Sequence, residues 1–140
     1  MAADFVKRFA EFWRAPVPER LDTLLAPDAR LSAPMIPTTT GFEAGRRAFT
    51  ALFDLIPDMT AEVHRWGATS DGVLIEFTVR GTAGGSHISW ESVDRFVLND
   101  RGLASERFTY FDSLPLVLSM MLRPRTWPGF ARSRIKQRHS

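Results

Sequence analysis

Residues 87–112, "HISWESVDRFVLNDRGLASERFTYFD", decide the fold because they contain two alternating segments joined by a short polar turn. In the first segment, one strand face carries Asp94 together with apolar residues, namely Ile88, Trp90, Phe96 and Leu98. "NDRG" supplies the turn, since asparagine, aspartate and glycine reverse the chain easily. The sequence therefore predicts an antiparallel hairpin with one carboxylate on a mainly apolar strand face.

The second strand of this hairpin ends in an acid next to aromatic rings. Alternate residues share a face, so one face carries Glu106, Phe108, Tyr110 and Asp112. The other face carries residues 107, 109 and 111. We therefore expect the carboxylate of Asp112 to point where the two rings point.

Two further strands precede the hairpin. "MTAEVHRWGAT" (59–69) and "VLIEFTVRGT" (73–82) are separated by "SDG", and glycines at 84 and 85 lead into the next strand. Four consecutive strands joined by short turns predict an antiparallel meander.

Helices are predicted in the first part of the chain. Residues 1–14 carry an apolar face at helical spacing, formed by Phe5, Phe9, Phe12 and Trp13. "VPERLDTLLAP" (17–27) has Pro18 in a first turn and Pro27 as a stop, and "ARLSAPM" (29–35) reads as a strand. A third helix is predicted over 40–57, with Thr40 and Glu43 at capping-box spacing. This order predicts an α+β fold, with three helices on one face of a curved antiparallel or mixed β-sheet.

Composition predicts one domain over residues 1–122, followed by a basic tail over 123–140 that holds six Lys or Arg residues and no acid. The absence of cysteine excludes disulfides and thiolate chemistry and is compatible with a reducing cytoplasm, where we expect the protein. The N-terminal segment lacks the apolar run of a signal peptide. The longest apolar run, residues 113–122, is far shorter than the roughly 20 residues that span a bilayer.

Four segments in this order resemble the nuclear transport factor two-like superfamily, in its SnoaL-like polyketide cyclase and ketosteroid isomerase-like branch. They are "PDARLSAPMIPTTTGFEAGRRAF" (27–49), "IPDM" (56–59), "VRGTAGG" (79–85) and "RGLASERFTYFD" (101–112), and the resemblance covers residues 5–115. It implies a cone-shaped, cystatin-like sheet closed by helices around an apolar pocket. It also implies a homodimer and no bound cofactor. Fold alone does not fix the activity, because this architecture hosts several reactions.

The catalytic patterns of the superfamily match this chain unevenly. Ketosteroid isomerase has an aspartate base before a proline where this chain has Ala33, and its oxyanion-binding tyrosine falls at Phe9. Its protonated aspartate has a counterpart in Asp94. The arginine and aspartate of limonene epoxide hydrolase have no match in the central strand. SnoaL-like cyclases resemble this chain best, because they depend on one acid/base aspartate near the end of the sheet, which fits Asp112.

Each candidate has a structural alternative. Asp112 could transfer protons in an apolar cavity or could cap the next helix. Burial of Asp94 among apolar residues would raise its pKa, whereas pairing with a neighbouring arginine would make it structural. His87 is a candidate proton shuttle, although a lone histidine is more often a surface residue. The catalytic candidates are therefore Asp112, Asp94 and His87.

Aromatic side chains are the candidate substrate-binding residues. His64 and Trp66 are expected on one strand face and Phe108 and Tyr110 on another, and these could stack on a flat substrate, with core packing as the alternative. Trp90 and Phe9 complete the candidate set. The three histidines, at 64, 87 and 139, do not form a metal-ligand spacing, so no metal is expected.

The leading functional hypothesis is a cofactor-independent cyclase or isomerase that uses general acid/base catalysis on a hydrophobic carbonyl compound. The alternative is a non-catalytic module that binds an apolar ligand or serves as a dimerising accessory protein. The expected partners are a small hydrophobic ligand and a second copy of the chain. Nucleic acid is not expected, because the basic tail reads as a solvated end, and only weak contact of the tail with a membrane surface is considered.

Overall fold

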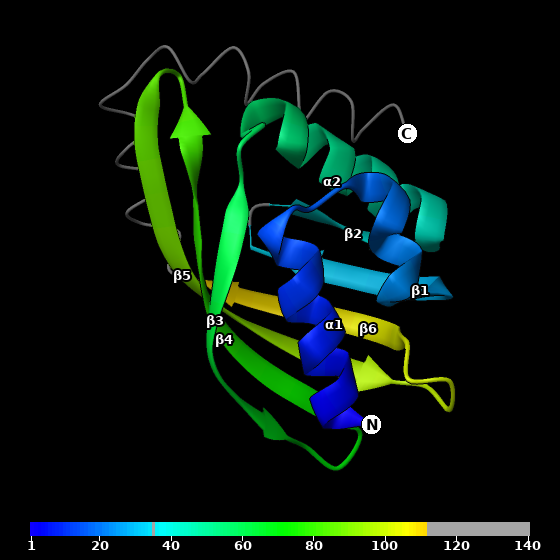
Figure 1. The fold of residues 1–140 in the computed structure, drawn as a ribbon. Coiled ribbons are helices and arrows are strands. Elements are labelled where there is room, and N and C mark those ends of the chain that lie inside the picture. The colour runs from blue at the N-terminus through cyan, green and yellow to red at the C-terminus, as the bar shows by residue number, and fades with distance from the viewer. Residues whose placement is uncertain (35, 112–140) are drawn as a thin grey trace.

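The computed structural model describes residues 1–34 and 36–111, and the structural statements below concern these residues. A six-stranded curved sheet has the strand order β2-β1-β6-β5-β4-β3 (Figure 1). The strands are β1 Leu25–Ala33, β2 Ile36–Thr40, β3 Thr60–Ala68, β4 Gly72–Ala83, β5 Ser86–Leu98 and β6 Ala104–Phe111. The helices are α1 Ala2–Arg14, the 3₁₀-helix η1 Pro18–Thr23 and α2 Phe42–Leu55. The α+β prediction, with three helices on a curved sheet, is confirmed.

The meander is also present as predicted. β3, β4, β5 and β6 pair antiparallel in sequence order, whereas β1 pairs parallel with β6, which makes the sheet mixed. α1 packs against β3 and β4, and α2 packs against β1 and β2, so both helices lie on the same side of the sheet (Figure 1). The space between helices and sheet is therefore where the core lies.

Aromatic rings of α1 fill the centre of this core. Phe5 and Phe9 are buried because they lie one helical turn apart on the face toward the sheet. The Phe5 ring lies 4.7 Å from Phe96 on β5, and the Phe9 ring meets Phe77 on β4 edge-on at 5.2 Å. Such tilted ring pairs add to the burial of apolar area. The predicted apolar face of the first helix therefore holds α1 to the sheet.

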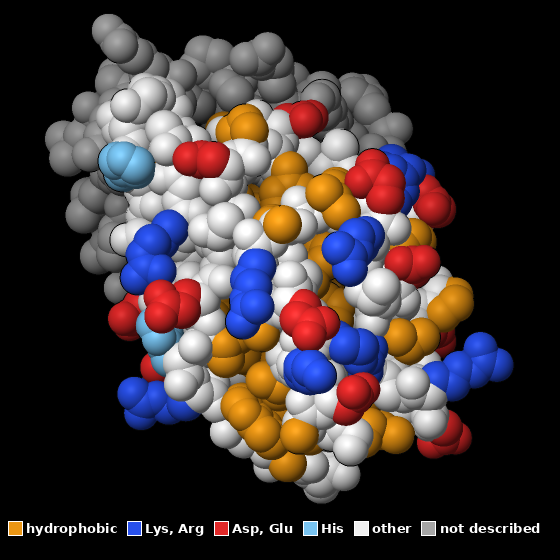
Figure 2. Space-filling view, viewed as in Figure 1, with side chains coloured by type: hydrophobic (Ala, Val, Ile, Leu, Met, Phe, Trp, Pro, Cys, Tyr) orange, Lys and Arg blue, Asp and Glu red, His pale blue; other side chains and the backbone are white. Residues whose placement is uncertain are grey.

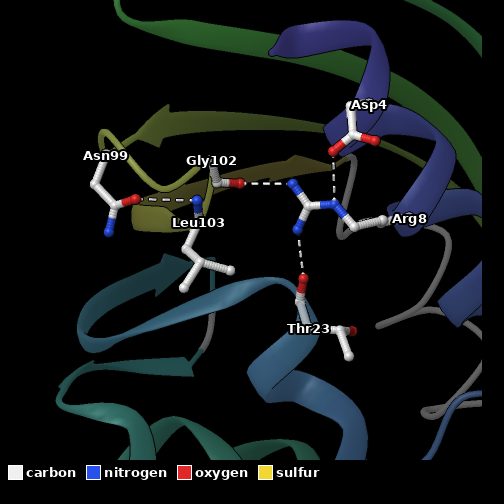
Figure 3. Close-up of polar contacts among 6 residues, drawn as sticks. All are labelled: Asp4, Arg8, Thr23, Asn99, Gly102 and Leu103. Carbon is white, nitrogen blue, oxygen red and sulfur yellow. Dashed lines mark hydrogen bonds and ion pairs between the residues drawn. The ribbon is translucent and has the colours of Figure 1, made fainter.

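A second set of contacts ties α1 to the turns at one end of the sheet (Figure 3). Arg8 pairs with Asp4 and donates hydrogen bonds to the carbonyl oxygens of Thr23 and Gly102. Asn99 in turn accepts hydrogen bonds from the backbone N–H groups of the β5–β6 turn. One guanidinium thus joins α1, η1 and the "NDRG" turn.

Two predictions about the N-terminal half were wrong. The helix predicted over 17–27 is only the 3₁₀-helix η1, and Pro27 lies inside β1 instead of ending a helix. Proline has no backbone N–H and cannot donate a ladder hydrogen bond. Accordingly, the register of β1 with β6 shifts between Leu25 and Arg30, the interval that contains Pro27.

The predicted capping box at Thr40 is also wrong, since Thr40 belongs to β2, a strand that the sequence analysis missed. α2 begins at Phe42, and Gly41 precedes it at φ 95° without a side-chain cap. That left-handed backbone favours glycine, which explains the residue at this position.

In the described part of the chain, no helix is long and apolar enough to cross a bilayer. The predicted domain boundary at residue 122 and the basic tail lie outside the described residues. Figure 2 shows Lys and Arg side chains intermingled with Asp and Glu on the helical face, so the described residues of this face form no stripe of one charge.

Candidate functional site

A buried carboxylate lies at the centre of the candidate site. The register of β5 and β6 pairs Asp94 with Thr109 and Phe96 with Arg107, which brings the polar side chains together on the helical face of the sheet. Asp94 is 0% exposed, its Oδ2 accepts a hydrogen bond from Arg107 Nε at 2.7 Å, and its Oδ1 accepts one from Thr109 Oγ1 at 2.7 Å. Both carboxylate oxygens therefore have partners.

Burial raises the pKa of Asp94 above its ordinary value, while the charge and hydrogen bond of Arg107 and the hydrogen bond of Thr109 act in the opposite direction. Both alternatives considered for Asp94 are therefore true: the carboxyl group is desolvated by burial, and it is paired with an arginine. A buried acid with a raised pKa is typical of functional sites, although ion pairs can also serve structure.

Arg107 connects this acid to an open pocket. Its guanidinium lies 5.1 Å from the ring centroid of Phe49 on α2, and its side chain is 14% exposed. Among the described residues, its hydrogen bond is made by Nε alone, so the Nη groups keep their donors for another acceptor. Arg107 is therefore the charged side chain through which the pocket meets Asp94.

The pocket lies between α2 and the β1–β2 pair. Its cavity volume is about 50 Å³, and the pocket opens to solvent. It is lined by Leu31, Ser32, Ala33, Pro37, Thr39, Ala48, Phe49, Leu52 and Arg107. The walls are thus mostly apolar, with Arg107 as the charged group and Thr39 as a hydroxyl group. The hydroxyl of Ser32 lies on the other face of β1, 3.2 Å from Thr38 Oγ1.

The structure places Phe108 and Tyr110 on the other face of the sheet. They alternate with Arg107 and Thr109, which point toward Asp94. The guanidinium of Arg95 lies 4.2 Å over the Phe108 ring, and Tyr110 is 54% exposed. These rings therefore share a face, as predicted, but it is the face away from the pocket. Asp112 lies outside the described residues.

The expectation that His64 and Trp66 share a strand face was wrong. A β-bulge between Val63 and Arg65 inserts His64 as an extra residue and reverses the alternation. His64 Nε2 lies 2.6 Å from Thr78 Oγ1, whereas Trp66 stands opposite the buried Ile75. The two side chains therefore lie on opposite faces of β3.

The remaining candidates occupy three different places. Phe9 is 1% exposed and packs on the core rings of Phe77 and Phe96. Trp90 shares the face of Asp94 and packs partly buried against the core, whereas His87 is exposed on the opposite face. The pocket and the ion pair are thus formed without these three residues.

Sequence reasoning missed Arg107 and Thr39 as site residues. Arg107 could have been found, because an arginine at an inward position of β6 must have a charged or pocket-facing partner. Thr39 could not, since β2 was not recognised. In the described ranges, no group of histidine, aspartate and glutamate side chains is suited to a metal ion.

The order of elements and the position of the pocket allow comparison with known proteins. The model of the SnoaL-like domain family matches residues 6–106. This chain belongs to the SnoaL-like domain family. A comparison with curated proteins finds no match.

Solved structures share the SnoaL-like fold. A loop-truncation variant of IdmH is 26% identical over 86% of this chain and 99% of its own, with a TM-score of 0.67. A candidate SnoaL-like polyketide cyclase from Jannaschia sp. CCS1 is 17% identical over 87% of this chain and 90% of its own, with a TM-score of 0.71. A nuclear transport factor two-like protein from Burkholderia pseudomallei K96243 is 19% identical over 87% and 96%, with a TM-score of 0.72. The predicted SnoaL-like family is confirmed, and the fold is the one shared by these structures.

Proposed function

We propose that this SnoaL-like protein is a cofactor-independent cyclase or isomerase that acts on a hydrophobic carbonyl compound by general acid/base catalysis. The observation that carries the proposal is the buried Asp94–Arg107 pair beside an apolar pocket. An apolar pocket with a few convergent polar groups is the usual form of a small-molecule site.

Arg107 is the group that meets the substrate in this proposal. When a base removes a proton from the carbon next to a carbonyl group, negative charge develops on the carbonyl oxygen. The Nη groups of Arg107 donate hydrogen bonds to that oxygen, and such donors act strongly where water is excluded. The resulting enolate then either attacks a second carbonyl carbon or takes the proton back at another carbon.

Asp94 is a positioning residue for this step. Its carboxylate holds Nε of Arg107 at 2.7 Å, and Thr109 holds the carboxylate in turn, so the guanidinium is oriented before substrate binds. The proton acceptor in the proposal remains Asp112, which is assigned from the family resemblance.

The second candidate is a protein that binds an apolar ligand without chemistry. It is favoured by Phe9 and Ala33, which stand where ketosteroid isomerase has its tyrosine and its base. Phe9 is packed into the core and has no hydroxyl to donate. The two candidates differ in whether protons move.

Proton exchange separates them without knowledge of the natural substrate. A panel of hydrophobic ketones is incubated with the protein in D₂O, and deuterium at the carbon next to the carbonyl group is followed by NMR. The enzyme hypothesis predicts exchange above the buffer rate, reduced about 10²–10⁴-fold by Asp112→Asn. Ketones that bind without exchanging at any pH would favour the non-catalytic module. Full exchange in the Asp112→Asn variant would instead remove Asp112 from the mechanism.

A further inference from the structure

We infer that the pocket binds an apolar compound through a planar, two-oxygen anionic head, either a carboxylate or the enolate of a 1,3-dicarbonyl, held by the Nη edge of Arg107. The inference rests on the proposed function for the position of the site and names the class of ligand.

The geometry of Arg107 selects for two oxygens. A guanidinium presents its donors as a rigid planar fork, which matches a pair of oxygens on one planar edge. Asp94 accepts from Nε, and no described residue accepts from Nη1 or Nη2. The edge formed by these two nitrogens is therefore the one left for a ligand, and a single ketone oxygen would use it only in part.

The pocket supplies a further donor. Thr39 Oγ1 is buried and has no hydrogen-bond partner among residues 1–34 and 36–111, and Thr39 lines the same pocket as Arg107. A buried hydroxyl without a partner costs free energy, so an acceptor that enters the pocket gains from satisfying it. Among the described lining residues, Arg107 and Thr39 can donate and none is a carboxylate, which favours a ligand head that only accepts.

The rest of the lining determines the body of the ligand. Leu31, Ala48, Phe49 and Leu52 offer apolar surface beside the guanidinium. A small, fully polar anion would leave these walls uncovered, whereas an aryl or alkyl group attached to the head would cover them. The expected ligand is therefore an apolar acid and not a free inorganic anion.

Binding of matched probes to the wild-type protein tests this inference. Hydrocinnamate and benzylacetone have the same skeleton, but the second replaces one carboxylate oxygen by a methyl group. Calorimetry at neutral pH should show hydrocinnamate binding at least about ten-fold more tightly, because bidentate charge-assisted bonds are the strong ones. Benzoylacetone provides the dicarbonyl arm, since its enolate is recognised by its ultraviolet absorbance when bound.

Selective binding of hydrocinnamate, of the benzoylacetone enolate, or of both supports the inference. The probe with the higher affinity shows whether the ligand's anionic head is a carboxylate or a dicarbonyl enolate. Equal affinity for hydrocinnamate and benzylacetone, together with benzoylacetone bound in its neutral form, would overturn it. Failure of all three probes to bind would do the same. These results do not depend on proton exchange, so a protein that selects the anion but exchanges no proton would refute only the proposed enzyme.

Variants locate the effect. Arg107→Gln should abolish the selectivity, and the double variant Asp94→Asn/Arg107→Gln should do so while leaving no unpaired buried charge. Arg95→Gln is the matched control, because Arg95 lies over Phe108 on the other face of the sheet and should leave binding unchanged. Selectivity that survives in the folded double variant would place the ligand elsewhere.

Discussion

Replacing Arg107 by glutamine should reveal how strongly the fold depends on the ion pair. Arg107 is the cation that pairs with Asp94 in the described part of the chain, and Asp94 is 0% exposed. Without the arginine, the carboxylate either stays ionised and unpaired, at a cost of about 3–5 kcal/mol, or takes up a proton. Protonation sets an upper limit to the cost, because the neutral acid is tolerated in an apolar site.

That limit follows from the ordinary pKa of aspartate. Keeping Asp94 protonated at pH 7 costs about 1.36 kcal/mol for each of the roughly three pH units that separate pH 7 from 3.8, or about 4 kcal/mol. Burial already raises the pKa of Asp94 in the wild-type protein, so part of this cost is present before the substitution. We therefore expect Arg107→Gln to lower the free energy of unfolding by about 2–4 kcal/mol at pH 7.

The loss should depend on pH with a definite sign. Arg107 lowers the pKa of Asp94, so its removal raises that pKa further. Below the wild-type folded pKa, both proteins hold the proton and this group makes no difference between them. As pH rises above that value, only the variant keeps the proton, so the variant becomes progressively less stable than the wild type.

Urea unfolding followed by tryptophan fluorescence between pH 4 and 8 measures this difference, since the chain has four tryptophans. Asp94→Asn is the matched control. Its amide oxygen can still accept from Arg107 Nε, but the guanidinium then lacks a counter-charge, so this variant should lose stability by an amount that does not depend on pH at this position. A loss in Arg107→Gln that is equal at pH 4 and pH 8, or smaller than about 1 kcal/mol at pH 8, would refute the reasoning.

Four further predictions concern other parts of the molecule. Gly45→Ala should weaken ligand binding with less than about 1 kcal/mol change in stability, because the added Cβ would lie 2.8 Å from the flexible end of Leu31 in the pocket wall. Arg8→Ala should cost about 2 kcal/mol in urea unfolding, since it removes charge-assisted bonds to two backbone carbonyls, and a loss below about 0.5 kcal/mol would contradict that role. The protein should sediment as a homodimer with facing sheets, and a 15.8 kDa species alone would contradict this. Removal of the residues after Pro128 should barely change the melting temperature, whereas a large loss would show that the tail docks.

The meander was predictable because its signals are local. Alternation in β5 fixes which residues point inward, and the "NDRG" turn fixes the pairing of β5 with β6. The apolar face of α1 was likewise visible in the spacing of its phenylalanines. Each of these signals involves residues that lie close together in the sequence.

The failures all arise where local signals are overridden. β2 was missed because "IPTTT" has a proline and little apolar alternation, and it forms a strand through its pairing with β1. The faces of β3 were misassigned because a single bulge at His64 reverses the alternation beyond it. Asp94 was identified from its apolar neighbours, but its partner Arg107 depends on cross-strand geometry that alternation within one strand does not show.

The position of the ion pair bears on its purpose. The other inward side chains of β5 around Asp94 are mainly apolar, and the core above them is built from aromatic rings. In such surroundings, well-packed apolar residues would stabilise the fold at least as well as a buried ion pair, so stability alone does not explain Asp94 and Arg107. Thr109 satisfies the second carboxylate oxygen, which lowers the cost of keeping the acid there. The ion pair supplies a fixed guanidinium edge in an apolar pocket, which apolar residues could not supply. The proposed ligand and chemistry depend on this edge.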